Sequence, residues 1–84
     1  MNRKQRIDKI ISKKFKDFLL EVVDNSNLHK GHNNFTGQDE THIKIILTKK
    51  NKIPINRLNI HRIIYDLLES EFKSGLHSLE ININ

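Results

Sequence analysis

Two different apolar spacings alternate along this chain, and their order limits the folds that it can adopt. Apolar residues recur every three or four positions in residues 3–17 and 57–73, which is the spacing of an amphipathic helix. They recur at every second position in residues 41–48 and 77–83, which is the spacing of a strand with one buried face. The short apolar run 18–24 also favours a strand. The predicted order is therefore helix, strand, strand, helix, strand.

These five elements predict one small α+β domain over residues 1–84. The chain has 84 residues, and independent domains commonly run from about 50 to 250 residues. Two helices covering one face of a three-stranded mixed sheet would bury every apolar stripe, with the second strand antiparallel to the first. Asn2 and Gln5 resemble a capping box before the first helix, and Gly75 suits the end of the second. The predicted core residues are Ile7, Ile10, Ile11, Phe15, Leu20, Val22, Ile43, Ile45, Leu47, Ile60, Ile63, Ile64, Leu67, Leu68, Phe72, Leu79, Ile81 and Ile83.

The chain contains no cysteine, which excludes several kinds of site. It cannot form a disulfide, a thiolate nucleophile or a thiolate-ligated zinc or iron–sulfur centre from its own residues. No apolar run approaches the roughly 18 residues that span a bilayer, and no apolar leader follows the basic start. We therefore expect no membrane association and a cytoplasmic location, with the mitochondrial matrix as the alternative. No catalytic motif is present either, so the sequence predicts a protein that is not an enzyme.

The chain has a formal net charge of +5, and its basic residues are concentrated in two parts of the sequence. The predicted first helix is rich in Lys and Arg, and residues 41–65 contain no acid. These residues form either a solvated basic surface or a contact with nucleic acid. His61 and Arg62 lie where a recognition helix would read a groove, but Asp66 and Glu69 follow on the exposed side and would repel phosphates. The candidate nucleic-acid residues are Lys49, Lys50, Lys52, Arg57, His61 and Arg62.

Three histidines are candidates for other chemistry, and a fourth is expected to be structural. The alternation places His77 on the apolar face at the start of the last strand, where it is either bonded to the backbone or a ligand. His29 and His32 lie in the polar stretch 25–40, where they are either solvated or two ligands of an incomplete metal site. His42 falls on the outer face of the second strand, so we expect it to be exposed and its replacement to be silent.

The chain resembles the BolA family from about Arg6 to Ile83. The resemblance depends on an ordered set of segments rather than on one motif. These are LEVVDNS (20–26), His-x-Gly-His (29–32), THIKIIL (41–47), the pair His61-Arg62 with Tyr65, and GLHSLEI (75–81). The resemblance implies a fold similar to class II KH domains with element order αββααβ. It also implies a third strand parallel to the first.

For the long helix, the resemblance implies a short helical turn near Pro54–Leu58, giving a helix-turn-helix-like element. Two departures from the family pattern fall in this element. The turn reads Asn-Lys-Ile-Pro (51–54) in place of an aromatic-x-Gly step, and Ile60 precedes His61-Arg62 in place of an arginine. Both departures weaken a role in DNA contact more than they weaken the fold.

The function that the resemblance implies is that of an iron–sulfur accessory, trafficking or iron-sensing protein. His77 matches the position that ligates iron in BolA–glutaredoxin complexes. The polar stretch would supply the second ligand, for which His29 is favoured over His32. A shared [2Fe–2S] cluster would then need two thiolates from a monothiol glutaredoxin and its bound glutathione.

Two other functions remain open from the sequence. One is a DNA-binding transcriptional regulator that uses the basic residues named above. The other is an adaptor that docks a protein on the exposed sheet face, with Leu19, Val23 and Ile46. Alone, the chain is expected to be a monomer or a weak dimer.

Overall fold

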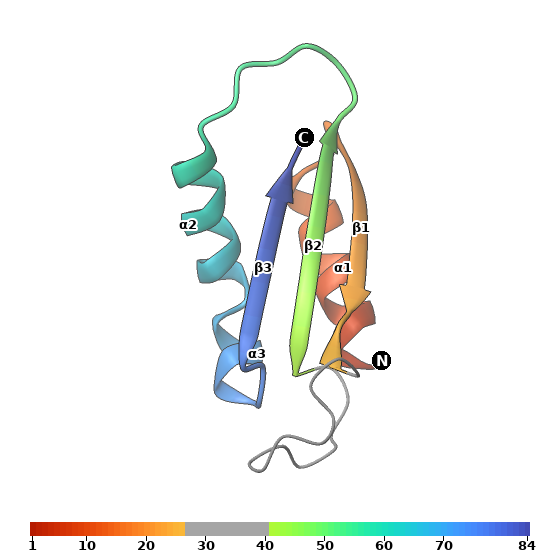
Figure 1. The fold of residues 1–84 in the computed structure, drawn as a ribbon, viewed down its shortest axis with the longest axis vertical. Helices are drawn as coiled ribbons and strands as arrows, with labels where there is room; N and C mark the ends of the chain where they lie inside the picture. The colour runs from red at the N-terminus through yellow and green to blue at the C-terminus, as the bar shows by residue number, and fades with distance from the viewer. Residues whose placement is uncertain (27–40) are drawn as a thin grey trace.

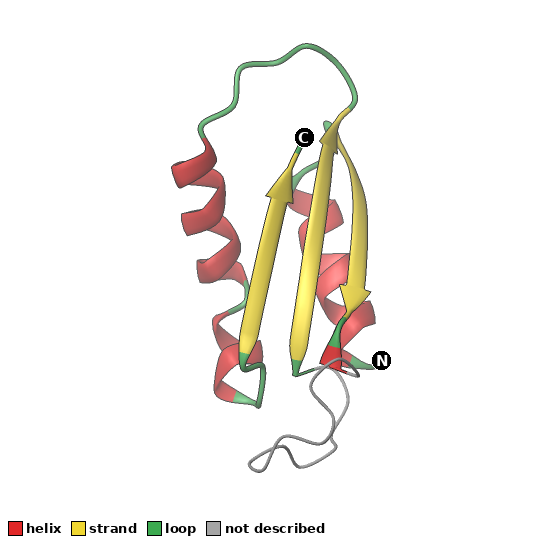
Figure 2. Cartoon of the chain, in the orientation of Figure 1, coloured by secondary structure: helices red, strands yellow, loops and turns green. Residues whose placement is uncertain are grey.

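The computed structural model describes residues 1–26 and 41–84 (Figure 1). These residues form three helices and three strands, in the predicted order αββααβ, within one small α+β domain. The described helices lie against one face of the sheet, and none of them covers the other face (Figure 2). The elements are α1 (Arg3–Lys14), β1 (Phe18–Asp24), β2 (His42–Lys49), α2 (Arg57–Leu67), α3 (Glu69–Lys73) and β3 (Ser78–Ile83).

The three strands form a mixed sheet in the order β1-β2-β3. β1 and β2 are antiparallel, as predicted, with Val22 opposite Ile45. β2 and β3 are parallel, with Ile45 opposite Ile81, so β3 runs antiparallel to β1. The prediction that the third strand is parallel to the first was therefore wrong. Because the helices between β2 and β3 carry the chain back to the end of the sheet where β2 begins, β3 must follow the direction of β2.

The core consists of the apolar stripes that the sequence predicted. The inward residues of β2 and the central residues of both long helices are fully or almost fully buried, while Leu19 on the outer face is 60% exposed. The alternation predicted for β1 and β2 is confirmed. The buried core residues are Ile7, Ile11, Phe15, Phe18, Val22, Ile43, Ile45, Leu47, Ile60, Ile64, Leu68 and Leu76.

The start of α1 is the predicted capping box. The Gln5 amide donates to Asn2 Oδ1 at 2.8 Å, and the Asn2 amide donates to Gln5 Oε1 at 3.0 Å. These bonds satisfy backbone donors that the first turn of a helix leaves without partners. The helix ends at Lys14, earlier than the predicted residue 17, because Phe15 leaves helical geometry and is buried in the core.

The predicted helix over 57–73 is divided into α2 and α3 at Leu68. This residue has φ −102° and ψ 14°, and its side chain is fully buried, so the apolar stripe continues through the break. After α3, Gly75 has φ 127°, a backbone conformation that favours glycine, as the sequence predicted for this end.

The helical turn implied near Pro54–Leu58 is absent from the structure described for this stretch. Residues 52–56 have no regular structure, and α2 begins directly at Arg57. Pro54 biases the residue before it towards extended geometry. Asn56 then caps the helix, because its Oδ1 accepts from the Asn59 amide at 3.0 Å. The helix-turn-helix-like prediction was wrong, and the second short helix of the fold is α3.

Shortening one side chain of α2 tests this account of the core. Ile64→Ala should lower the free energy of unfolding by about 2–4 kcal/mol, because Ile64 is fully buried and the change leaves a cavity. Ile63→Ala should cost less, since Ile63 is only partly buried. Urea denaturation measures both, and Leu19→Ala is the control, with an expected effect within about 0.5 kcal/mol. An Ile64→Ala effect no larger than that of the control would contradict this packing.

Candidate metal-binding site

His77 lies just before β3, at the end of the sheet where β2 also begins (Figure 1). Its backbone amide donates to the Thr41 carbonyl at 2.8 Å, and the Ser78 amide donates to the same oxygen at 3.1 Å. Both amides therefore share one acceptor at the start of the strand. The His77 side chain is exposed, so it is not buried with the apolar face of the strand, where the sequence placed it.

His42 is the first residue of β2 and is half-buried. Its Nδ1 lies 2.9 Å from the hydroxyl oxygen of Thr41, and its carbonyl accepts from the Asn25 amide at 2.8 Å. Both the ring and the backbone of His42 are thus held by hydrogen bonds. The sequence placed His42 on the outer face correctly but predicted a more exposed side chain.

The structure brings His42 and His77 together. Their ring centroids are 6.1 Å apart and the ring planes are tilted by 53°. The cause is the parallel pairing of β2 with β3, in which His42 lies opposite Ser78. The sequence analysis missed this pair, although each histidine lies at the predicted start of a strand, and a parallel register aligns two strand starts.

The two other candidate ligands, His29 and His32, lie outside the described residues. Among the residues that the structure does describe, no group of three or more His, Asp or Glu side chains could hold a metal ion. The described site therefore offers two imidazoles. Two imidazoles fit a [2Fe–2S] cluster only when two further ligands come from elsewhere, because such a cluster takes four.

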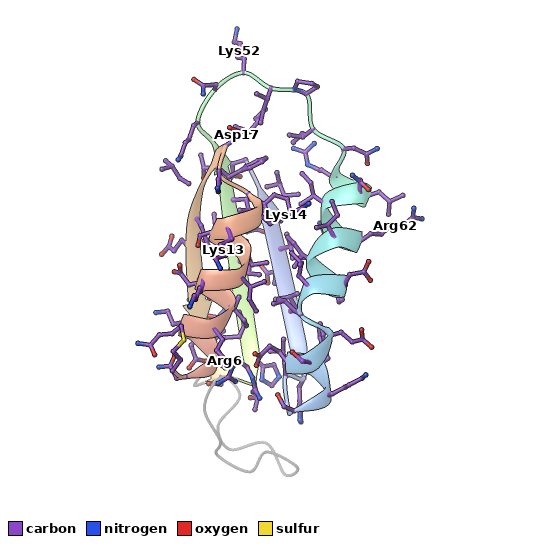
Figure 3. The ribbon with its side chains drawn as sticks, turned by 180° about the vertical axis from the view of Figure 1, so that it is seen from behind. Arg6, Lys13, Lys14, Asp17, Lys52 and Arg62 are labelled. Carbon is purple, nitrogen blue, oxygen red and sulfur yellow. The ribbon has the colours of Figure 1, made fainter. Side chains whose placement is uncertain are left out.

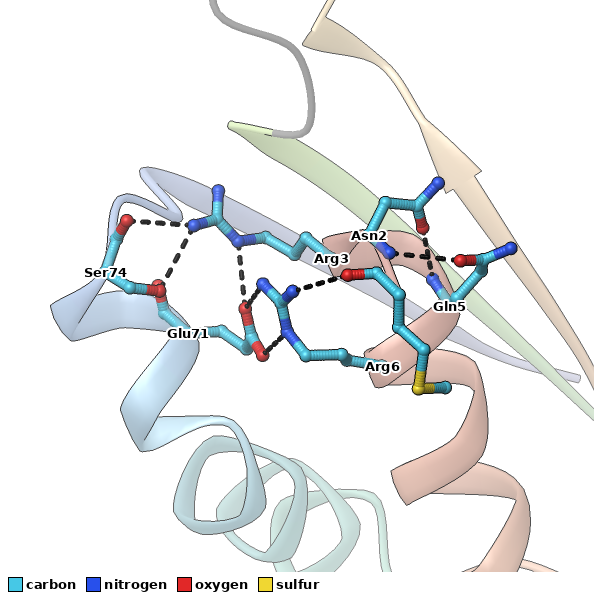
Figure 4. Close-up of polar contacts among 7 residues, drawn as sticks. Asn2, Arg3, Gln5, Arg6, Glu71 and Ser74 are labelled. Atoms are coloured by element: carbon cyan, nitrogen blue, oxygen red, sulfur yellow. Dashed lines mark hydrogen bonds and ion pairs between the residues drawn. The ribbon is translucent and has the colours of Figure 1, made fainter.

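A cluster of ion pairs around the buried carboxylate of Glu71, which we call the Glu71 cluster, fixes the chain next to this site (Figure 4). The Glu71 carboxylate accepts from Arg3 Nε at 3.0 Å and from Arg6 Nε at 2.8 Å. Arg3 also donates to the Ser74 carbonyl at 2.9 Å, and its guanidinium lies against Gly75. The cluster thereby ties the start of α1 to α3 and to the turn that leads to His77.

The Glu71 cluster changes the pKa of its carboxyl group. Hydrogen bonds from Arg6, and secondarily from Arg3, hold the pKa of Glu71 below its ordinary value of 4.5, although burial acts in the opposite direction. Arg3 and Arg6 belong to the basic stretch that the sequence suggested as a nucleic-acid contact. In the structure both guanidinium groups instead form ion pairs with the buried carboxylate of Glu71.

The other end of the sheet collects most of the remaining basic residues, and we call it the basic end. Lys50 Nζ donates to the Lys16 carbonyl at 3.0 Å, and Arg57 donates to the Ile83 carbonyl at 3.4 Å. Figure 3 shows Lys13 and Lys14 near the end of α1, with Lys52 at the tip of the connection to α2. The basic end thus consists of Lys13, Lys14, Lys16, Lys49, Lys50, Lys52 and Arg57.

The six residues predicted to contact nucleic acid therefore do not form one recognition helix. Lys50, Lys52 and Arg57 are exposed at the basic end, where Lys49 is partly buried. His61 is half-buried on α2, and Arg62 extends outward from α2 (Figure 3).

Comparisons with known proteins agree with this architecture. A family profile described as BolA-like protein matches residues 11–84. The chain is 34% identical over 82 residues to the chloroplastic protein BOLA1 of Arabidopsis thaliana, covering 95% of this chain and 51% of that protein. It is 32% identical over 79 residues to the DNA-binding transcriptional regulator BolA of Escherichia coli (strain K12), covering 94% of this chain and 71% of that protein. The solved BolA domain of SufE1 from Arabidopsis thaliana superposes with a TM-score of 0.79 and 36% identity, covering 100% of this chain and 92% of that one.

The protein is a small α+β domain with a mixed sheet that helices cover on one face, and two histidines lie together at one end of this sheet. The chain belongs to the BolA-like family, as the sequence resemblance indicated. It spans about half the length of the chloroplastic relative, and some relatives are named as transcriptional regulators. No helix in the described parts of the chain is long and apolar enough to cross a membrane.

The lowered pKa of Glu71 predicts how stability depends on pH. A carboxyl group with a lowered pKa in the folded state stabilises the protein above its unfolded pKa, near 4.5, and this contribution is lost as the pH falls through the folded pKa. Glu71→Gln should lower the free energy of unfolding by about 1–3 kcal/mol at pH 7. It should also flatten the loss of stability that the wild type shows below about pH 5.

Urea denaturation between about pH 7 and pH 3 measures both effects. Glu69→Gln is the matched control, because Glu69 forms an exposed pair with Lys73 at 3.0 Å and such pairs contribute little. Equal pH slopes for Glu71→Gln and the wild type would contradict this account of the cluster.

Proposed function

We propose that this protein is an iron–sulfur accessory protein that binds a monothiol glutaredoxin and shares a [2Fe–2S] cluster with it. The observation that supports this most directly is the exposed imidazole of His77, placed beside a second imidazole at one end of a chain that has no cysteine. Family membership supports the same role.

The ligand count explains why such a cluster would need two proteins. Iron–sulfur clusters are normally held by four thiolates, and this chain has none. Two imidazoles from this chain would complete a site only with two thiolates from outside. A glutaredoxin cysteine and the cysteine of its bound glutathione are two such thiolates. His77 is the ligand that we assign first, and His29 and His32 remain the predicted candidates for the second.

Imidazole ligation would also change the chemistry of the shared cluster. Where two histidines replace two cysteines on one iron, the reduction potential is higher than in all-thiolate clusters. A protein that adds imidazole ligands to a glutaredoxin would therefore suit cluster transfer or iron sensing. We propose this non-enzymatic role in the cytosol or in the mitochondrial matrix.

Reconstitution tests the proposal. The chain, mixed with a glutathione-loaded monothiol glutaredoxin, iron and sulfide, should give a coloured heterodimer whose visible circular dichroism differs from that of the glutaredoxin homodimer. His77→Ala should shift this spectrum or speed the loss of the cluster, because one ligand is removed. The isolated chain should hold no stable cluster.

His61→Ala is the matched control, because it removes an imidazole from α2, away from the proposed site. A heterodimer spectrum that is unchanged by His77→Ala, or a stable cluster on the isolated chain, would contradict the proposal.

A second candidate function is nucleic-acid binding, which the basic end favours. Seven basic residues gather there, with Asp17 as the acid labelled beside them in Figure 3. Because α2 has no preceding helical turn and carries Asp66 on its exposed side, phosphate contacts are better supplied by the basic end than by a recognition helix. The relative named as a DNA-binding regulator supports this class of function.

Salt dependence tests this candidate. If the basic end neutralises about 4–6 phosphates, the slope of log affinity against log salt should be near −4 to −5. Lys52→Gln should weaken binding and flatten the slope by about one. Fluorescence anisotropy with a labelled duplex measures this, and Lys73→Gln, at the other end of the molecule, should leave the slope unchanged. Absence of binding at about 50–100 mM salt would remove nucleic-acid binding as a function.

A further inference from the structure

We propose that the outward side of α2 is the surface through which two copies of this chain form a weak symmetric dimer. This surface, which we call the α2 stripe, consists of Leu58, Arg62, Tyr65, Asp66 and Glu69. The inference goes beyond the proposed function, because it uses no histidine and does not require a cluster, a glutaredoxin or a nucleic acid.

The residues of the α2 stripe lie on the side of the helix that faces away from the core. After Leu58 they follow at four, seven, eight and eleven positions, and this spacing keeps them on one side because a helix has about 3.6 residues per turn. The buried residues Ile60 and Ile64 lie on the opposite side. All five residues of the stripe are exposed, and Figure 3 shows Arg62 extending outward from α2.

Two large apolar side chains belong to the α2 stripe. Leu58 is 60% exposed and Tyr65 is 45% exposed. The other exposed large apolar residues in the described part of the chain are Met1 and Leu19, which lie on different elements. A single exposed apolar residue is common. Two of them on one side of a short helix, with a tyrosine next to an arginine, have the composition of the centre of a protein interface.

The ring of Tyr65 is held in place in the single chain. It stacks on Phe72 of α3, with the ring centroids 5.3 Å apart and the ring planes 8° apart. Phe72 in turn packs against the core, so it supports Tyr65 from the core side. An aromatic side chain that is already fixed loses less conformational freedom when a partner covers it. Tyr65 is therefore well suited to the centre of the contact.

The charges of the α2 stripe point to a second copy of the chain as the occupant. Arg62 and Asp66 lie one helical turn apart and carry opposite charges, yet neither takes part in the ion pairs of the described residues. A partner that complements both must carry an acid opposite Arg62 and a base opposite Asp66. The stripe itself has this arrangement when a two-fold axis makes two α2 helices antiparallel, because a two-fold contact between two residues always occurs twice.

One position of the two-fold axis suits the charges and the apolar residues together. If the axis crosses α2 at the level of Ile64, midway between Arg62 and Asp66, each Arg62 lies opposite the Asp66 of the other copy. Tyr65 is then about 1.5 Å along the helix from the axis, so the two tyrosine rings meet at the centre. Leu58 lies about 9 Å from the axis, at the rim of the contact.

The size of the α2 stripe predicts that the dimer is weak. The 11 residues of α2 form a helix about 16 Å long, and one helical stripe covers less than the roughly 1,200–2,000 Å² of a stable interface. We therefore expect a dissociation constant on the order of 0.1–1 mM. In this dimer Arg62 pairs with a carboxylate rather than with phosphate, which agrees with the position of Asp66 beside it.

A charge exchange across the axis tests the dimer. Arg62→Asp alone and Asp66→Arg alone each place like charges opposite each other on both sides of the axis. Each variant should therefore weaken dimerisation at least about tenfold. An equimolar mixture of the two variants should dimerise about as well as the wild type, because both contacts then join opposite charges. Sedimentation velocity up to about 1 mM protein measures all four samples.

Three further variants locate the contact. Tyr65→Ala should weaken dimerisation at least about tenfold because it removes the central ring, whereas Tyr65→Phe keeps the ring and should remain within about twofold of the wild type. Leu19→Asp, on the outer face of the sheet, is the control and should leave the dimer unchanged. Thermal unfolding of each variant shows that the domain is folded before sedimentation is measured.

Four outcomes would overturn the proposal. The first is a folded wild type that stays monomeric up to about 1 mM. The second is a mixture of the two charge variants that dimerises no better than either variant alone. The third is a dimer that Leu19→Asp dissociates, which would place the contact on the sheet. The fourth is an Arg62→Asp variant that loses affinity for duplex DNA but sediments like the wild type, which would assign Arg62 to nucleic acid instead.

Discussion

The ion pairing of the buried Glu71 carboxylate is the interaction that fixes the end of this domain where the two histidines lie. Burying a carboxylate is costly unless it is paired and hydrogen-bonded, and here Arg3 and Arg6 supply both kinds of contact. These arginines are 68 and 65 residues away in the sequence. The pairing closes the domain by joining the start of α1 to α3. Since β3 follows α3 after one turn, the same contact helps to position His77, which lies in this turn directly before β3.

The parts of the fold that were predicted from sequence are those determined by local spacing. The stripes of α1 and α2, the alternation of β2 and the capping box all depend on residues within about one or two turns of one another. The direction of β3 and the break at Leu68 depend on packing between distant segments, and periodicity carries no information about either. The Glu71 cluster also joins distant segments. The sequence analysis therefore counted its two arginines only as basic charge and did not predict their pairing with Glu71.

The histidine site was also predicted only in part, for the same reason. His77 was selected because the segment around it resembles a family motif, and its exposed position is compatible with a ligand. His42 was placed on the correct face but was taken to be structural, because alternation along one strand does not identify the neighbouring strand. Only the parallel register, with His42 opposite Ser78, places the two rings 6.1 Å apart. The family resemblance assigned a role to His77 because that residue lies in a matching segment. It did not identify His42 as a neighbour, because the two histidines come together only through the pairing of two strands.

The two candidate functions use opposite ends of the molecule. The described chain measures 44 × 22 × 21 Å, with the paired histidines at one end of its sheet and the basic end at the other (Figures 1 and 3). Lys13 and Lys14 also lie in the last turn of α1, where they complement the helix dipole, so part of the basic charge has a structural role. Because the Glu71 cluster engages Arg3 and Arg6, part of the positive charge near the histidines is compensated by a buried acid. The residues proposed for the two functions are therefore different, because no histidine belongs to the basic end.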